Sequence, residues 1–201
     1  SFSKLATVDT TYRIGLSASP YREDGRTDYI FALTGYPVGL KWRELIDLGV
    51  VAEPDVSVYL YSTRNRKRTD LQRLVNGRTG KILVFCDGID EGKQVAEELG
   101  VPFVHGETRD RMQYFDEHRV VVASRVADEG LSIEDLDTVI EYDFHGGSRR
   151  QEAQRAGRVM HGDGDGEHIV LMTDEEYEKY GDRLYSLEEQ GFNINVQRGE
   201  E

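Results

Sequence analysis

The segment 148–158 has the residues best suited to chemistry. It reads SRRQEAQRAGR and has four arginines within eleven residues, in a half of the chain that is otherwise acidic. On a helix, one face would carry the positions spaced by three, four and seven residues, namely Gln151, Gln154, Arg155 and Arg158. A guanidinium donates two parallel hydrogen bonds to phosphate oxygens and stays charged when water is removed. The spacing therefore predicts a polyanion site with an arginine aimed at a γ-phosphate. The alternative is a solvated or salt-bridged helix face.

Other candidate motifs in the sequence lack the residues or the spacing that their sites require. Residues 15–19 (GLSAS) approach the G-x-S-x-G elbow of hydrolases but end in serine where glycine is needed. The five histidines never fall at i, i+4, and there is one cysteine, so a zinc site has almost no ligands. The acidic run at 163–167 lacks the distal Glu of a calcium loop, and residues 77–82 lack the spacing of a phosphate loop. We expect none of these sites.

Short β-branched runs predict the elements that would position segment 148–158. Strands are expected at 12–16, 56–61, 81–86, 120–123, 138–142 and 168–172. Most are apolar without alternation, which is typical of strands covered on both faces of a parallel sheet. Helices are expected at 89–99, 108–117, 148–159 and 174–189. Strand and helix alternate from about residue 55 onward, which predicts an α/β fold with a mainly parallel sheet flanked by helices.

The first quarter of the chain does not follow this alternation. It offers one strand at 12–16, a polar stretch, and a helix at 41–48 with Gly49 at its end. A single strand lacks neighbours with which to pair. We therefore expect residues 1–50 to be the end of another domain plus a linker, and residues 51–201 to form a second domain.

The charge distribution is asymmetric. The chain has 25 Lys and Arg against 38 Asp and Glu, a net charge of −13, and the whole excess lies after residue 100. Such a field repels nucleic acid overall and is typical of a solvated acidic surface, so a halophilic, archaeal source is a hypothesis. A basic cluster at 64–68 is either a phosphate-backbone contact or an exposed linker.

The chain shows no sign of export or of a membrane segment. Its apolar runs are far shorter than the roughly 20 residues that span a bilayer. The first ten residues lack the zones of a secretory signal, and one cysteine cannot form an internal disulfide. We expect a cytoplasmic, reducing location without a membrane partner, associated with the nucleoid if the source is archaeal.

Several segments, in order, resemble the motifs of superfamily two helicases. They are 17–19 (SAS) for motif three, 82–86 (ILVFC) for motif four, 105–108 (HGET) for the segment after it, 121–133 (VVASRVADEGLSI) for motif five and 154–158 (QRAGR) for motif six. The sequence Arg22-Glu23-Asp24 after motif three, and residues 147–151 before motif six, are similar to the XPB branch of DNA repair and transcription helicases. The resemblance covers nearly the whole chain.

The resemblance implies two RecA-like domains with ATP in the cleft between them and DNA running across both. This chain would hold the end of the first domain and all of the second. The phosphate loop and the D-E-x-H site would belong to the missing first domain, which would bind most of the ATP and Mg²⁺. The chain alone is therefore expected to be inactive.

The resemblance also implies residue roles. It assigns catalysis to Arg158, as arginine finger, and Arg155. The nucleotide-binding positions are Gln154, Gly130 and Glu129. The positions for DNA binding or coupling are Ser17, Ser19, Arg22, Glu23, Asp24, Ser124 and Arg125. Implied partners are DNA, the chain's own N-terminal RecA-like domain, and a nuclease or a transcription or repair protein.

Three positions depart from the family pattern. His161 stands where motif six has a further arginine, Ser132 stands where motif five commonly has aspartate, and Ser19 replaces threonine. Two alternatives follow. The chain could be part of a motor of a restriction or defence system, or a noncatalytic RecA-like module that binds a partner, which His161 and Ser132 favour weakly.

Overall fold

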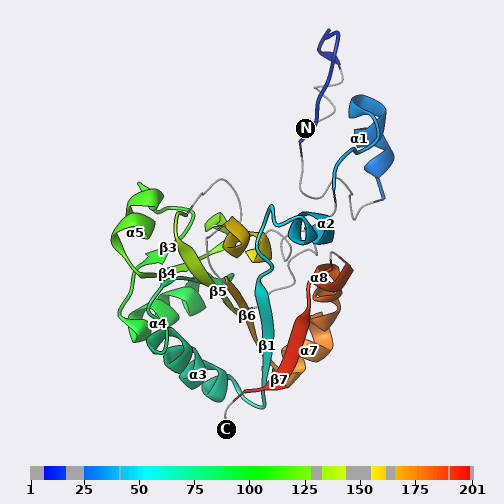
Figure 1. Cartoon of the computed structure of the whole chain (residues 1–201). Coiled ribbons are helices and arrows are strands. Elements are labelled where there is room, and N and C mark those ends of the chain that lie inside the picture. The colour runs from blue at the N-terminus through cyan, green and yellow to red at the C-terminus, as the bar shows by residue number, and fades with distance from the viewer. Residues whose placement is uncertain are drawn as a thin grey trace. The chain divides into compact units, whose positions relative to one another are not determined.

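The computed structural model describes residues 7–16, 25–40, 42–127, 133–143, 155–161, 166–189 and 191–199. The chain divides into two compact units, residues 1–41 and residues 42–201. The helices are α1 (Thr27–Thr34), α2 (Trp42–Asp47), α3 (Arg64–Asn76), α4 (Ile89–Leu99), α5 (Arg111–Glu117), α7 (Asp174–Tyr180) and α8 (Tyr185–Glu189). The strands are β1 (Asp55–Tyr61), β2 (Lys81–Cys86), β3 (Phe103–Val104), β4 (Val120–Ala123), β5 (Leu136–Asp143), β6 (Glu167–Thr173) and β7 (Ile194–Arg198) (Figure 1).

The second unit is built on one parallel sheet of seven strands in the order β3-β4-β2-β5-β6-β1-β7. Each neighbouring pair is parallel, so the predicted α/β fold class is confirmed. Five of the six predicted strands occur. Two strands were not predicted: β3, which has two residues, and β7, whose last four residues are exposed at the sheet edge.

Alternation along β2 divides the core between the two faces of the sheet. Ile82, Val84 and Cys86 point to the face covered by α3 and α4, which lie side by side in Figure 1. Leu83 and Phe85 point to the opposite face, where they pack with residues from α5 and from the short turns after β4 and before β6. Burial raises the pKa of the Cys86 thiol. Both faces are covered, which is why β2 reads as an uninterrupted apolar run.

Helix α3 includes the basic cluster at 64–68, for which the sequence allowed either an exposed linker or a phosphate-backbone contact. Thr63 caps its first turn by accepting from the backbone N–H of Arg66. Lys67 is buried, with its Nζ 2.7 Å from Glu176, and Arg68 pairs with Glu91 of α4 at 3.2 Å. Two of the four basic side chains therefore hold α3 against its neighbours, and the linker interpretation was wrong.

The first unit contains α1, which buries none of its residues. The predicted strand at 12–16 was wrong, because the structure shows no regular element there and leaves Tyr12, Ile14 and Leu16 more than four-fifths exposed. A parallel strand needs a hydrogen-bonded neighbour, and residues 7–16 and 25–40 supply none. The second unit begins at Trp42, and α2 contributes Ile46 to its core.

Within the described part of the chain, no helix has the length and apolar character needed to cross a membrane.

The ion pair between Arg78 and Glu167 predicts a pH dependence of stability. Arg78 donates hydrogen bonds to both carboxylate oxygens of Glu167, and its Nη2 is 2.9 Å from Glu167 Oε1. This hydrogen bonding is the main reason that the pKa of Glu167 lies below its usual value. A carboxyl group whose pKa is lower in the folded state than in the unfolded state stabilises the fold at pH values above the unfolded pKa, which is about 4.3 for Glu. This contribution is lost as the pH falls through the pKa of the folded state. Glu167→Gln should therefore lower the free energy of unfolding by about 1 kcal/mol at pH 7.

Urea unfolding at pH 7 and at about pH 3.5 tests this expectation, because the difference from the parent chain should shrink at the lower pH. Glu178→Gln, at an exposed position of α7, is the control and should change stability little at either pH. A Glu167→Gln deficit that is equal at both pH values would contradict the assignment.

Candidate functional site

Polar side chains gather where the central strands of the sheet end. Asp87 directly follows β2, Ser124 and Arg125 directly follow β4, and Asp143 is the last residue of β5. Because β2 pairs with both β4 and β5 in parallel, these carboxyl ends lie at one edge of the sheet. Open α/β sheets bind ligands at this edge.

Arg155 is buried at this edge, with 1% of its side chain exposed. Its Nη1 donates to Glu141 Oε2 at 2.9 Å and its Nη2 to Asp87 Oδ1 at 3.2 Å. Its guanidinium also lies 4.7 Å above the ring of Phe85. A buried charge is tolerated only when it is paired and hydrogen-bonded, and two carboxylates satisfy that condition here.

The ionic network extends in two directions from Arg155. Toward β6, the Nε2 of His168, which is fully buried, lies 3.4 Å from Glu141 Oε1. Toward the surface, the second oxygen of Asp87 accepts from Arg125 Nη2 at 3.0 Å, and about half of the Arg125 side chain is exposed. The network therefore connects the interior of the sheet to solvent through Asp87.

The segment that carries Arg158 is anchored by its other residues. Ala156 packs with the cluster formed by Val56, Leu187 and Phe192, and Val159 packs into the core face beneath α5. Arg158 itself is partly exposed. Positions 155, 156 and 159 are buried, whereas Arg158 keeps part of its surface exposed although its Nε is buried.

Close packing keeps this segment in place. A Cβ atom on Gly166, the residue directly before β6, would lie 2.3 Å from the backbone oxygen of Val159. Only glycine allows β6 to begin so close to the segment.

The predicted exposed helix face is not formed as expected. Residues 155 and 156 are helical, but Gly157–His161 is a 3₁₀ turn. Arg155 is buried while Arg158 is partly exposed, so these two arginines do not share an exposed face. The reason is that Glu141 and Asp87 bind the guanidinium of Arg155 inside the domain. Contact of Arg155 with nucleotide stays a prediction.

Two predicted DNA-contacting positions are described by the structure. Ser124 is buried, and its backbone N–H donates to the carbonyl of Val104 at 2.9 Å. Arg125 begins the 3₁₀ turn Arg125–Ala127 and is exposed. The other predicted site residues lie outside the described part of the chain: Ser17, Ser19, Arg22, Glu23, Asp24, Glu129, Gly130 and Gln154.

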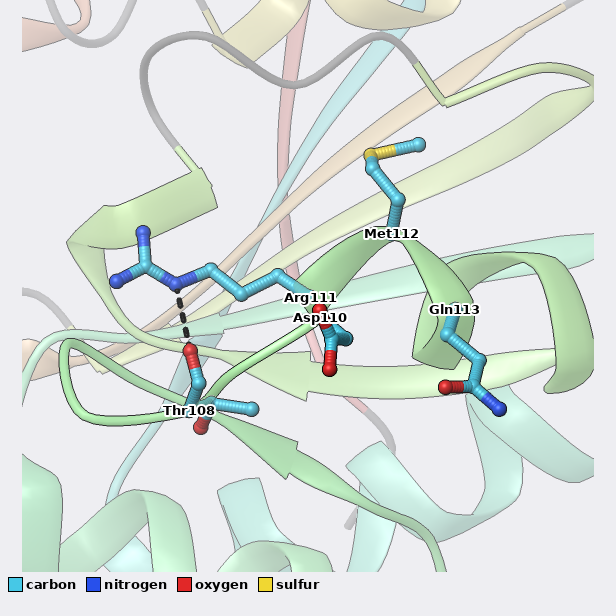
Figure 2. A pocket seen from close by; sticks show the side chains of 5 residues that line it. All are labelled: Thr108, Asp110, Arg111, Met112 and Gln113. Atoms are coloured by element: carbon cyan, nitrogen blue, oxygen red, sulfur yellow. Dashed lines mark hydrogen bonds between the residues drawn. The ribbon is translucent and has the colours of Figure 1, made fainter.

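A shallow pocket of about 460 Å³ lies at the start of α5, beside the predicted H-G-x-x segment. Figure 2 shows Arg111 turned back to the carbonyl of Thr108, with Met112 and Gln113 pointing in different directions. Arg111 also donates to the carbonyl of Gly106 at 2.7 Å. Its guanidinium therefore stabilises the loop, and the pocket adds little to the site at the strand ends.

Sequence reasoning missed Asp87, Glu141 and His168. Glu141 and His168 each interrupt an apolar strand, and both are completely buried. A polar or charged residue within a strand that is covered on both faces requires a buried partner, and this was the available signal.

The described residues do not fit a magnesium site. Among them there is no group of three or more His, Cys, Asp or Glu side chains that could hold a metal ion. The carboxylates of the network are bound by guanidinium groups instead.

Comparisons with known proteins place the chain in a family. The model of the family "ERCC3/RAD25/XPB C-terminal helicase" matches residues 57–193. "Putative DNA 3'-5' helicase Rad25" of Haloarcula marismortui is 36% identical over an alignment of 203 positions, which covers 85% of this chain and 32% of the relative. The protein of the same name from Halobacterium salinarum is 35% identical over an alignment of 225 positions, which covers 95% of this chain and 37% of the relative. The chain thus spans about a third of the length of these relatives.

A solved structure of Saccharomyces cerevisiae Dbp5 bound to RNA and ADP BeF3 has a TM-score of 0.69 and 16% identity, and the match covers 90% of this chain and 50% of that one. At this identity the likeness concerns the fold, which is RecA-like. The family model, by contrast, matches more than half of the sequence, including all of β2, β4 and β5 and the arginine segment. The chain belongs to the ERCC3/RAD25/XPB C-terminal helicase family.

Proposed function

We propose that the chain is the second RecA-like half of an XPB-like, ATP-dependent DNA helicase or translocase. The observation that carries the proposal is the placement of Arg158, which is partly exposed on a segment whose neighbours at 155, 156 and 159 are buried. This is the arrangement that an arginine finger needs, because its charge must be held at a fixed position before the γ-phosphate arrives. The names of the Rad25 relatives support the same activity.

The proposed mechanism is closure of two domains on ATP. Arg158 donates to the γ-phosphate and stabilises the charge that develops as the phosphoryl group is transferred. Arg155 holds the segment through its two carboxylate partners, with Gln154, Glu129 and Gly130 near the nucleotide. Hydrolysis removes the γ-phosphate contact and releases the domains, so each cycle changes the grip on DNA.

The first RecA-like domain would supply the groups that bind phosphates and Mg²⁺. We propose that residues 1–50 are the end of that domain plus a linker and that residues 51–201 are the second domain. Ser17, Ser19, Ser124 and Arg125 would contact DNA or transmit its binding, and Arg22-Glu23-Asp24 would act as a wedge or latch near the point of strand separation. A nuclease or a transcription or repair protein is the proposed partner.

The direct test is ATP hydrolysis by the full-length protein that contains this chain. We expect phosphate release that rises when DNA is added, together with displacement of a labelled strand or translocation on duplex DNA. A full-length protein that binds partners but releases no phosphate in the presence of DNA would favour the noncatalytic module.

The isolated chain is expected to release no phosphate, with or without DNA. An arginine finger stabilises only charge that other groups have positioned, and the sequence contains no phosphate loop. Malachite green assays on the purified chain measure this, with the full-length protein as the positive control. DNA-stimulated turnover by the chain of 201 residues would contradict the division of roles between the two domains.

A further inference from the structure

We propose that Asp87 is a positioning residue that couples DNA contact at Arg125 to the placement of Arg158 at the nucleotide. The proposal rests on the function proposed above and adds a residue and a direction of coupling to it. Asp87 belongs to neither arginine-bearing segment, yet it contacts both.

The geometry of Asp87 allows one carboxylate to serve two guanidinium groups. Its Oδ2 is 3.0 Å from Arg125 and its Oδ1 is 3.2 Å from Arg155. The Asp87 side chain is 3% exposed and that of Arg155 is 1% exposed, whereas that of Arg125 is 51% exposed. One partner is therefore inside the domain and the other is within reach of a ligand in solvent.

The backbone on either side of Asp87 is held firmly. The next residue, Gly88, donates its N–H to Asp143 Oδ2 at 2.9 Å, which ties the turn after β2 to the end of β5. The preceding residue, Cys86, is fully buried in the sheet. If Arg125 moves away, the backbone of Asp87 cannot follow it. The Asp87 carboxylate then loses Arg125 as a hydrogen-bond partner.

A phosphate that reaches Arg125 competes with Asp87 for the same guanidinium. Both are anionic acceptors, and a charge-assisted hydrogen bond to one weakens the bond to the other. When DNA withdraws Arg125, the negative charge of Asp87 is compensated mainly by Arg155, and attraction between buried charges is screened less than at the surface. The ion pair between Asp87 and Arg155 should then tighten.

A tighter ion pair between Asp87 and Arg155 also affects the position of Arg158, because the two arginines are close in the chain. The two residues are three positions apart, and the 3₁₀ turn Gly157–His161 that carries Arg158 follows directly. Ala156 and Val159 are buried on either side of Gly157 and Arg158, so the segment behaves as one packed unit. A tighter hold on Arg155 therefore fixes Arg158 more firmly, which is how DNA would stimulate hydrolysis.

The test uses the full-length protein with Arg125→Gln, Asp87→Asn and the double variant. Arg125→Gln should raise the Kd for DNA, measured by anisotropy of a labelled duplex, and should raise the DNA-independent kcat about tenfold, because Asp87 is released to Arg155 without DNA. Asp87→Asn should lower kcat at saturating DNA about tenfold without raising the Kd for DNA, since Arg125 loses a competing acceptor. The double variant should show the low kcat of Asp87→Asn.

Asp90→Asn is the matched control, because Asp90 is exposed on the first turn of α4, and it should change neither constant. A merely structural role for Asp87 would weaken DNA binding together with kcat, and that result would overturn the proposal. An Arg125→Gln variant whose DNA-independent kcat does not rise would also overturn the proposal. This measurement does not depend on the folding of any Asp87 variant. A parent protein without DNA-stimulated hydrolysis would instead refute the proposed function.

Discussion

Replacing Arg158 by alanine in the full-length protein is expected to lower kcat for ATP hydrolysis by about 10³-fold or more. As the proposed arginine finger, Arg158 would act on charge that develops in the transition state, so the loss should appear in kcat rather than in the KM for ATP. Arg158 is partly exposed on a segment that other residues anchor, so the fold should remain intact. Steady-state hydrolysis at saturating DNA, together with a thermal unfolding curve, measures both expectations.

Arg158→Lys should restore little activity, because a single ammonium does not reproduce the fork of the guanidinium. Arg198→Ala is the control, since Arg198 forms a surface pair with Asp174 in which both side chains are largely exposed. Hydrolysis by Arg158→Ala at the parent rate would assign Arg158 to an ordinary surface interaction and remove the central argument for the motor.

Replacing Glu141 by leucine is expected to destabilise the chain by about 3–5 kcal/mol. The change removes a carboxylate with no exposed surface from both Arg155 and His168, so Arg155 keeps its buried charge with less compensation. A loss of this size is a large fraction of the total stability of a domain, which is about 5–15 kcal/mol. Urea unfolding of the 201-residue chain measures it.

The double variant Glu141→Leu with Arg155→Met should recover part of this loss, because it removes both charges of the pair between Glu141 and Arg155. The recovery should be incomplete, since Asp87 loses Arg155 and, among the described residues, keeps only Arg125 as an ion-pair partner. Glu97→Leu, at an exposed position of α4, should stay within about 0.5 kcal/mol of the parent. Additive losses in the double variant would show that Glu141 and Arg155 do not depend on one another.

Much of the sheet could be predicted because its buried strands consist mainly of apolar residues, which can be recognised in the sequence. β2 and β4 lie between covered faces, so each needs an apolar run, and such runs are visible without any knowledge of neighbouring strands. The same reasoning failed at residues 12–16, where an apolar pattern has no partner strand among the described residues. It also missed β7, because an edge strand with exposed side chains needs no apolar pattern.

Helix α3 was missed for a related reason. Its basic residues suggested a surface segment, whereas Lys67 is buried against Glu176 and the ring of Tyr142. Whether a cation faces solvent or a carboxylate depends on which elements fold against it. Glu176 is more than a hundred positions away in the chain, so no local pattern could show this pairing.

The α/β class and the helicase-like motifs, with Arg158 as the predicted finger, can be found in the linear chain, because hydrophobic runs and motif spacing are properties of the amino-acid order. The burial of Arg155 among Asp87, Glu141 and His168 cannot be found there and appears only in the folded domain. The physical reason is that the partners of a buried charge come from strands that the sheet order brings together: Asp87 follows β2, Glu141 lies on the neighbouring β5, and His168 lies on β6 beyond it. The desolvation of Arg155, and hence its role as an anchor, exists only once those strands have paired.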